Sequence, residues 1–355
     1  MPAASLEPEI TSNFVFATCR EGSERALKEE VATEHGPTLR PAFMRPQLIT
    51  WKSVHPLKAG FSVKSIFARV LGISLGTFKS PEELIAYAAE HLKDRSFHLH
   101  VFPREVPEDG VPEETWEKAE ELRKKLADAL KEAGVKLSAG GKIERNDLVL
   151  DVILMDEQGA LLLGVHRHTT HSQEAPGGLP HLVVSAEAPS RTWLKMEQAL
   201  IWAGWDGPNA LKGKTVLELG SSPGGSSYSL LQHGARVVGV DSGVMAPVVL
   251  DFPGGTFTHM QMSAGDLADV PLPANIKIIV VDMNIAPPQM LRHLERIQAR
   301  VRASAMLLTL KINNTSMERN MDRFIGILRR FAPMPIRATQ LPANRAEICV
   351  VAGKI

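Results

Sequence analysis

Short apolar runs alternate with amphipathic segments over the second half of the chain. Strands are expected near residues 215–219, 236–241, 276–282, 304–311 and 346–352. Segments with helical periodicity at 288–303 and 316–331 predict helices between them. This alternation predicts an α/β domain with a doubly wound, Rossmann-like parallel sheet. A ligand is expected at the carboxyl ends of its strands.

The first half of the chain mixes strands and helices less regularly. Strands are expected at 13–19, 47–51, 97–102, 147–155 and 160–165, and helices at 21–31, 80–92 and 112–133. The run 65–71 fits either a strand or a helix. No glycine-rich ligand turn follows these strands, so residues 1–170 are interpreted as an α+β accessory module. Residues 171–187 predict a linker, and residues 188–355 form the second domain.

The segment ELGSSPGG, residues 218–225, predicts a tight turn between a strand and a helix. A second apolar run ends in Asp241, where a carboxylate can accept both hydroxyls of a ribose. Glycine has no Cβ and lets the backbone approach a ligand closely. The spacing differs from the dinucleotide fingerprint G-x-G-x-x-G. The acid at Glu218 suits the cationic S-adenosylmethionine. The alternative is a Rossmann-like turn without a cofactor.

These motifs define the candidate cofactor-binding residues, and Asp266, in SAGD, is expected at the adenine edge. The full set is Glu218, Gly220, Ser222, Pro223, Gly224, Gly225, Asp241, Asp266 and Asp282.

Four charged residues are expected at the ligand-facing ends of different elements. Lys195 lies in a predicted helix before the first strand of the domain. Asp282 ends the strand IKIIVVD, Lys311 ends MLLTLK, and Glu347 starts the last strand. Taken singly, each is typical of a solvated surface charge. Their joint position favours a catalytic site.

Composition narrows the function classes. The chain has 355 residues, of which 44% are hydrophobic, enough for two or three domains with real cores. Only two cysteines occur, so a disulfide framework is not expected. The low cysteine count instead favours a reducing, cytoplasmic location. No apolar run reaches the roughly 18 residues of a membrane span, and the first residues do not have the pattern of a secretory signal. His166, His168 and His171 have no Cys or acid at metal-ligand spacing, so no metal is expected.

Charge is unevenly distributed along a chain that is neutral overall. Residues 1–200 hold 24 Lys and Arg against 29 Asp and Glu, whereas residues 201–355 hold 16 against 11. The basic excess in the second half is mild support for a polyanionic partner such as RNA. A solvated basic face explains it equally well.

The motifs together resemble the FtsJ-type ribose 2′-O-methyltransferases, and among them the family of the ribosomal RNA large-subunit methyltransferase M (RlmM). The motifs are APSRTWLK at 188–195, ELGSSPGG at 218–225, GVDSG at 239–243, VVDM at 280–283, TLK at 309–311 and RAE at 345–347. Residues 14–31 resemble the family's opening segment more weakly. The chain departs from the family after TLK, where a nearly neutral segment replaces the usual basic one.

The resemblance implies a class I methyltransferase domain behind an N-terminal ferredoxin-like and THUMP RNA-binding module. It implies transfer of a methyl group from S-adenosylmethionine to a ribose 2′-hydroxyl, on a cytidine of 23S ribosomal RNA before full subunit assembly. Lys195, Asp282, Lys311 and Glu347 match the family's catalytic tetrad in order. A small-molecule O-methyltransferase and a non-catalytic RNA-binding factor are the alternatives.

Lys311 is the candidate base for the ribose hydroxyl. A lysine is almost fully charged at about pH 7, so its pKa has to fall by about three units. Burial, Lys195 and the sulfonium are expected to lower it, whereas Asp282 and Glu347 oppose that change. The two carboxylates are therefore assigned to orientation and charge balance, and Lys195 to orienting the ribose or its phosphate.

Overall fold

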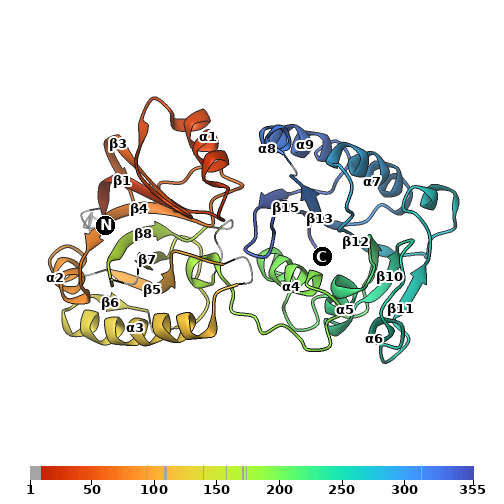
Figure 1. Cartoon of the computed structure of the whole chain (residues 1–355), viewed down its shortest axis with the longest axis horizontal. Coiled ribbons are helices and arrows are strands. Elements are labelled where there is room, and N and C mark those ends of the chain that lie inside the picture. The colour runs from red at the N-terminus through yellow and green to blue at the C-terminus, as the bar shows by residue number, and fades with distance from the viewer. Residues whose placement is uncertain are drawn as a thin grey trace, which may run out of the picture. The chain divides into compact units, whose positions relative to one another are not determined.

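The computed structural model describes residues 9–93, 95–107, 110–138, 140–156, 158–169, 172, 174–312 and 314–355. The chain divides into two compact units, one ending at His181 and the other beginning at Leu182, which lie within the predicted linker (Figure 1). Within the described residues, no helix is long and apolar enough to cross a membrane.

The first unit is built on one eight-stranded sheet with the strand order β2-β3-β1-β4-β8-β7-β5-β6. The strands are β1 Thr11–Thr18, β2 Leu39–Arg45, β3 Leu48–Lys58, β4 Val70–Phe78, β5 Ser96–Pro103, β6 Lys136–Leu137, β7 Leu148–Leu154 and β8 Leu161–Arg167. Strand β5 is parallel to β6 and β7, and the other neighbouring pairs are antiparallel. The ambiguous run 65–71 joins the sheet only from Val70 onward.

Three helices accompany this sheet: α1 Glu24–His35, α2 Pro81–His91 and α3 Glu113–Glu132. Helix α2 begins as the capping pattern predicts, because the Ser80 side chain accepts a hydrogen bond from the Glu83 N–H. Apolar residues of α2 and α3 share one core with the strands, for example Leu84 and Leu126 with Leu150.

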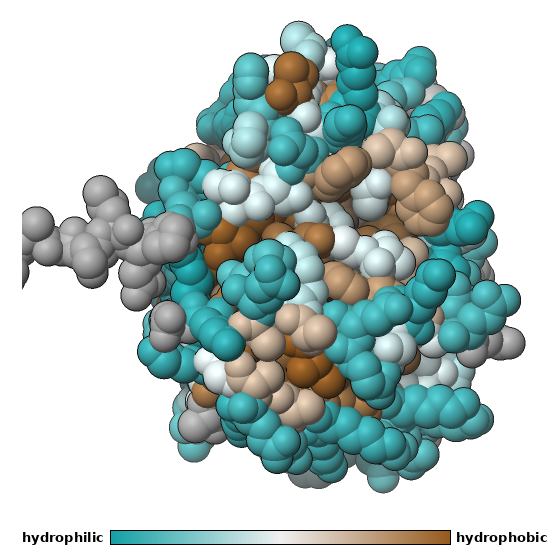
Figure 2. All heavy atoms as spheres, turned by 90° about the vertical axis from the view of Figure 1, so that its left-hand side faces the viewer, coloured by the Kyte–Doolittle hydropathy of each residue, from teal (hydrophilic) through white to brown (hydrophobic). Residues whose placement is uncertain are grey.

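Figure 2 views this unit from one side, where polar side chains surround patches of apolar ones. The expected α+β composition is therefore observed.

The second unit holds a seven-stranded sheet with the order β11-β10-β9-β12-β13-β15-β14. The strands are β9 Thr215–Leu219, β10 Arg236–Val240, β11 Phe257–Met260, β12 Ile276–Val281, β13 Ala305–Lys311, β14 Ile336–Thr339 and β15 Glu347–Gly353. Five of them coincide with the expected strands. Strands β11 and β14 were not predicted, because each is only four residues long and largely half-buried.

The expectation of a wholly parallel sheet is wrong at one edge. Strands β9 to β13 are parallel, but β15 is antiparallel to both β13 and β14. The connection from β14 to β15 is only residues 340–346. A parallel crossover needs about a dozen residues or more, so this short connection requires antiparallel pairing.

Helices cover both sides of this sheet (Figure 1). They are α4 Thr192–Ala203, α5 Gly225–Gln232, α6 Pro247–Leu250, α7 Pro287–Val301, α8 Thr315–Arg319 and α9 Met321–Leu328. Helix α5 contacts α4 and α6, whereas α7 contacts α9. The helix predicted over 316–331 is divided at Asn320 into α8 and α9. The sheet core between the layers includes Trp193, Leu200, Val280 and Leu307.

Candidate active site

The glycine-rich turn lies where it was expected, between β9 and α5. Gly220 has φ +84° and Gly224 has φ +115°, a region that favours glycine. A Cβ on Gly220 would lie 2.5 Å from the Asp282 carbonyl oxygen, and one on Gly224 would lie 2.6 Å from Val249. These glycines therefore also allow the protein to pack closely against itself. The expected close approach of a ligand stays a prediction.

Gly225 also packs closely against the protein, here against the segment that precedes and begins α4. The motifs did not predict this contact. A Cβ there would lie 2.3 Å from the hydroxyls of Ser190 and Thr192. The segment before α4 thus packs directly onto the turn. The Tyr228 hydroxyl on α5 also hydrogen-bonds Glu187. These contacts were missed, although APSRTWLK was recognised as a motif, because periodicity alone does not place a loop against a distant turn.

Asp241 follows the end of β10 and faces the turn. Its Oδ2 accepts a hydrogen bond from the Ser222 N–H at 3.1 Å, and its Oδ1 accepts one from the Gly243 N–H at 2.7 Å. The Ser222 hydroxyl in turn donates to the Val244 carbonyl at 2.8 Å. The carboxylate is thereby held in one orientation at the sheet edge. Each of its oxygens keeps further acceptor capacity for a hydroxyl group.

Glu218 is fully buried on β9, beneath the turn. Its Oε2 accepts a hydrogen bond from the Ser227 hydroxyl, and its Oε1 has no partner in the described part of the chain. Burial raises the pKa of Glu218 to about 8, and the carboxylates of Asp282 and Asp241 act in the same direction. The residue is therefore uncharged at about pH 7 unless a cation approaches it.

Two other expected residues of the cofactor set are more exposed. Pro223 is exposed in the turn, and Asp266 is exposed at the start of the short 3₁₀ helix η2, Asp266–Asp269. The side chains of Pro223 and Asp266 do not belong to the cluster of buried charges described next. The adenine contact of Asp266 stays a prediction.

The four expected catalytic residues meet in one compact cluster. Lys195 Nζ lies 3.4 Å from Asp282 Oδ2 and 2.8 Å from Glu347 Oε2. Lys311 Nζ lies 3.2 Å from Asp282 Oδ1 and also hydrogen-bonds Glu347. Each lysine therefore contacts both carboxylates, and the four charges alternate around a ring. We call these four residues the tetrad.

Four separate elements bring the tetrad together. Lys195 is on the first turns of α4, Asp282 directly follows β12, and Lys311 ends β13. Glu347 begins β15 and pairs directly with Lys311, because β15 is antiparallel to β13. In a parallel strand, the first residue would lie at the opposite edge of the sheet. The unexpected direction of β15 is thus what completes the cluster.

The ionisation of the tetrad differs from the expectation. Burial lowers the pKa of Lys311, but the charges of Asp282 and Glu347 together outweigh it and hold this pKa above its usual value. Burial raises the pKa of Glu347, and the two lysines outweigh it in the opposite direction. Without a ligand, all the attraction favours an ammonium at Lys311. The expected lowering of its pKa is therefore wrong for this state.

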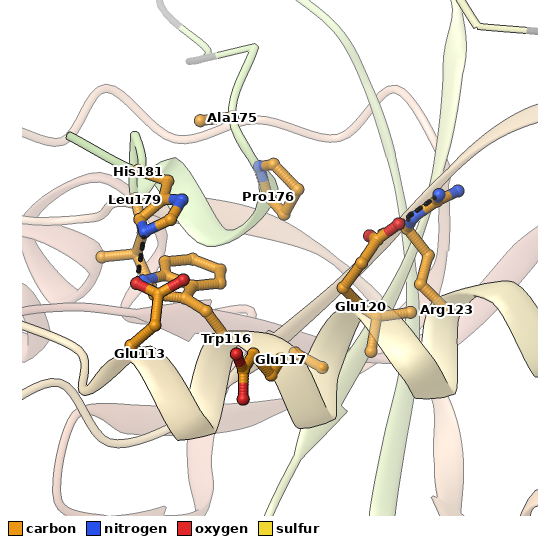
Figure 3. Close-up of a pocket in the computed structure, with 11 residues that line it drawn as sticks. Glu113, Trp116, Glu117, Glu120, Arg123, Ala175, Pro176, Leu179 and His181 are labelled. Carbon is orange, nitrogen blue, oxygen red and sulfur yellow. Dashed lines mark hydrogen bonds and ion pairs between the residues drawn. The ribbon is translucent and has the colours of Figure 1, made fainter. Parts of the chain in front are cut away.

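A hollow of about 420 Å³ lies in the first unit, between α3 and residues 175–181 (Figure 3). Glu113, Glu117 and Glu120 line it, and His181 hydrogen-bonds Glu113 at 2.9 Å. Its one arginine, Arg123, is bound to Glu120 at 2.7 Å. This acidic lining is unsuited to a phosphate group.

The histidine-rich segment has no metal-binding arrangement in the part of the chain that is described. His166 Nδ1 lies 2.6 Å from Asp151 Oδ2, and no group of three or more potential ligands is arranged around a common point there. His168 is buried, and His171 lies outside the described residues.

Comparison with known proteins assigns the second unit. Residues 188–322 match the model of a family described as "FtsJ-like methyltransferase". The second unit contains an FtsJ-like methyltransferase domain. The predicted FtsJ-like methyltransferase domain is thereby confirmed over these residues, and this family uses S-adenosylmethionine.

The similar curated proteins are named ribosomal RNA large subunit methyltransferase M. The protein from Xylella fastidiosa (strain 9a5c) is 32% identical over 187 residues, which are 50% of each chain. The protein from Colwellia psychrerythraea is 34% identical over 116 residues, 32% of this chain and 30% of that one. The chain thus matches half or less of the length of these relatives. The solved structure of TrmN from Thermus thermophilus covers 96% of this chain and 99% of that one at 16% identity, with a TM-score of 0.37, too low to support an argument.

The residues of the methyltransferase domain fit its cofactor. The Asp241 carboxylate is held in one orientation and keeps acceptor capacity of the kind that ribose hydroxyls need, and the unpartnered Oε1 of Glu218 is an acceptor of the kind that an ammonium group needs. Asp282 adds a third carboxylate close to the turn. The THUMP assignment of the first unit stays a prediction.

Proposed function

We propose that this protein transfers a methyl group from S-adenosylmethionine to a ribose 2′-hydroxyl of RNA. The observation that carries the proposal is the tetrad, held beside the cofactor turn of an FtsJ-like domain. Large-subunit ribosomal RNA is the proposed substrate, in line with the names of the similar proteins. The proposed nucleotide is a cytidine of 23S RNA, modified before full assembly of the subunit.

When bound, S-adenosylmethionine supplies an electrophilic methyl group on a sulfonium. The protein then has to hold the 2′-oxygen in line with that methyl group and remove the hydroxyl proton. We assign orientation of the ribose to Lys195 through its ammonium N–H groups. Asp282 and Glu347 fix the two lysines, because each carboxylate touches both ammonium groups.

Lys311 is the proposed base, in its neutral form. Its raised pKa in the free protein means that this form is rare at about pH 7. A cation placed beside Asp282 competes for that carboxylate and weakens its hold on the Lys311 proton. A sulfonium held near Asp282 would act as such a cation and would favour the neutral form of Lys311 that the reaction needs.

The decisive experiment compares 2′-O-methylation in total RNA from a deletion strain and from wild type. A single missing methyl group, restored by the wild-type gene and not by Lys311→Ala, is the expected result. An unchanged methylation pattern would contradict the proposal.

Cofactor binding has its own test, by calorimetry. S-adenosylhomocysteine should bind the wild-type protein, and Asp241→Asn should weaken binding by about tenfold or more because a charged acceptor is lost. NAD is the control ligand. Equal affinity for NAD would reject the cofactor assignment.

A further inference from the structure

One face of the first sheet carries several exposed side chains at its β2–β3–β1 end, beside Phe16, Leu48 and Thr50 of the same face, which are buried. Directly opposed residues of antiparallel strands lie on the same face of a sheet. Phe14 is paired with Lys52, and Lys52 is paired with Arg40. These three side chains form a row across the three strands, and all three are exposed.

A second part of the same face comes from β2. Phe43 is paired with Thr50, and Arg45 is paired with Leu48, so both share the face of Lys52. The Arg45 guanidinium lies 5.1 Å from the centre of the Phe43 ring. Phe14 and Phe43 are each 42% exposed. The opposite face of these strands is buried, with Val15, Ile49 and Trp51 at 1% exposure or less.

The charge of this face has one sign. Strands β1, β2 and β3 contain four Lys and Arg residues and no Asp or Glu. Lys58 is neutralised by Glu9 at 2.6 Å, whereas Arg40, Arg45 and Lys52 have no ion-pair partner in the described part of the chain. The acid-lined hollow beside α3 shows that this basic character is local to one end of the sheet.

We propose that Phe14, Arg40, Phe43, Arg45 and Lys52 form a binding face for single-stranded RNA, which we call the β1–β3 face. Unpaired bases stack on exposed aromatic rings, and the flanking cations contact phosphates. A duplex keeps its bases stacked inside, so it gains nothing from the two phenylalanines. The inference rests on the proposed function, since RNA is the partner, and it names the kind of RNA that the first unit holds.

The aromatic part is tested in the full-length protein with a labelled single-stranded RNA of about 12 nucleotides. Phe14→Ala/Phe43→Ala should weaken binding by about fivefold or more for each ring that stacks a base. A duplex of the same length should bind with unchanged affinity. Leu250→Ala, which removes an exposed apolar side chain of the second unit, is the matched control and should have no effect.

The basic part is tested by salt dependence. Replacing Arg40, Arg45 and Lys52 by Gln should reduce the slope of log affinity against log salt by about 2, at about 0.7 for each phosphate contact. The control replaces Lys124, Lys125 and Lys131, on α3, by Gln and should leave the slope unchanged. Circular dichroism and thermal unfolding confirm that each variant is folded.

Two results would overturn the inference. One is wild-type affinity for single-stranded RNA in the Phe14→Ala/Phe43→Ala variant. The other is a change in oligomeric state with unchanged RNA affinity, which would make the face a protein-docking surface. Lys311→Ala should bind the RNA like wild type. An unchanged methylation pattern in the deletion strain, together with RNA binding that depends on Phe14 and Phe43, would reject the proposed function and leave this inference standing.

Discussion

The two units each bury a cluster of carboxylates and nitrogen bases, with opposite consequences for protonation. In the second unit, two lysines share two carboxylates, and the pKa of Lys311 is raised. In the first unit, Asp151 lies between His166 and His100, 2.6 Å and 3.8 Å away. Burial there lowers the pKa of His100 to about 4, against the attraction of Asp151.

The ratio of charges explains the difference. Lys311 touches two carboxylates, which together outweigh the effect of burial on its pKa. One carboxylate is shared by two imidazoles in the first unit, and His98 and His168 add repulsion. His100 is therefore neutral at about pH 7 and suits a structural role. Partly accessible charges with strong partners make a reactive site, whereas a fully buried, partly neutral cluster contributes to stability.

The largest expected effect is loss of activity on changing the tetrad. Lys311→Ala should reduce turnover by a factor of about 10² to 10⁴, the usual contribution of a general base. Binding of S-adenosylhomocysteine should change little. Lys311→Arg should also fail, because arginine stays protonated at all working pH values. More than about a tenth of wild-type turnover in Lys311→Arg, roughly 1.4 kcal/mol of barrier, would make Lys311 an electrostatic support instead.

The pH dependence of activity should follow the raised pKa of Lys311. The neutral base becomes more abundant as pH rises, so kcat/KM should increase about tenfold per pH unit from about pH 7, without levelling off below about pH 9. Initial rates at subsaturating cofactor and RNA, where kcat/KM reports the ionisation of the free enzyme, measure this. A pH-independent rate over that range would be incompatible with Lys311 as base.

The histidine cluster should produce a pH dependence of stability instead. In the unfolded chain, His100 takes up a proton near pH 6.5, whereas in the folded protein it does so only near pH 4. The unfolded state therefore binds more protons between these values, and stability falls as the pH drops through that window, by about 3 kcal/mol in total. The free energy of unfolding, measured with urea, should fall by this amount in the wild type as the pH drops from about 6.5 to about 4. It should not show this fall in His100→Gln. His55→Gln, at an exposed position, is the control.

A smaller effect is expected from Asp151→Asn. The amide keeps the shape but removes the charged acceptor of His166, which should cost the first unit about 2 kcal/mol of unfolding free energy. Turnover of the folded protein should be unchanged. A loss of turnover with unchanged stability would show that the comparison between the two clusters is wrong.

The individual strands and the candidate catalytic residues of the second unit could be predicted from the sequence. The runs at 215–219 and 276–282 were recognised because buried parallel strands are continuously apolar, and they correspond to β9 and β12. The four tetrad residues were found because each stands at the end of such a run or in a matching motif. The edge strands β2 and β14 escaped notice, since exposed or half-buried strands have no clear apolar pattern.

The placement of these strands and side chains relative to one another depends on the tertiary structure. The antiparallel direction of β15 places Glu347 opposite Lys311, and sequence periodicity contains no information on strand direction. The sign of the Lys311 pKa shift depends on distances between four elements, because burial and charge pull in opposite directions. The glycines of the turn are required by contacts with Asp282, Val249, Ser190 and Thr192, and such long-range packing exists only in the folded chain.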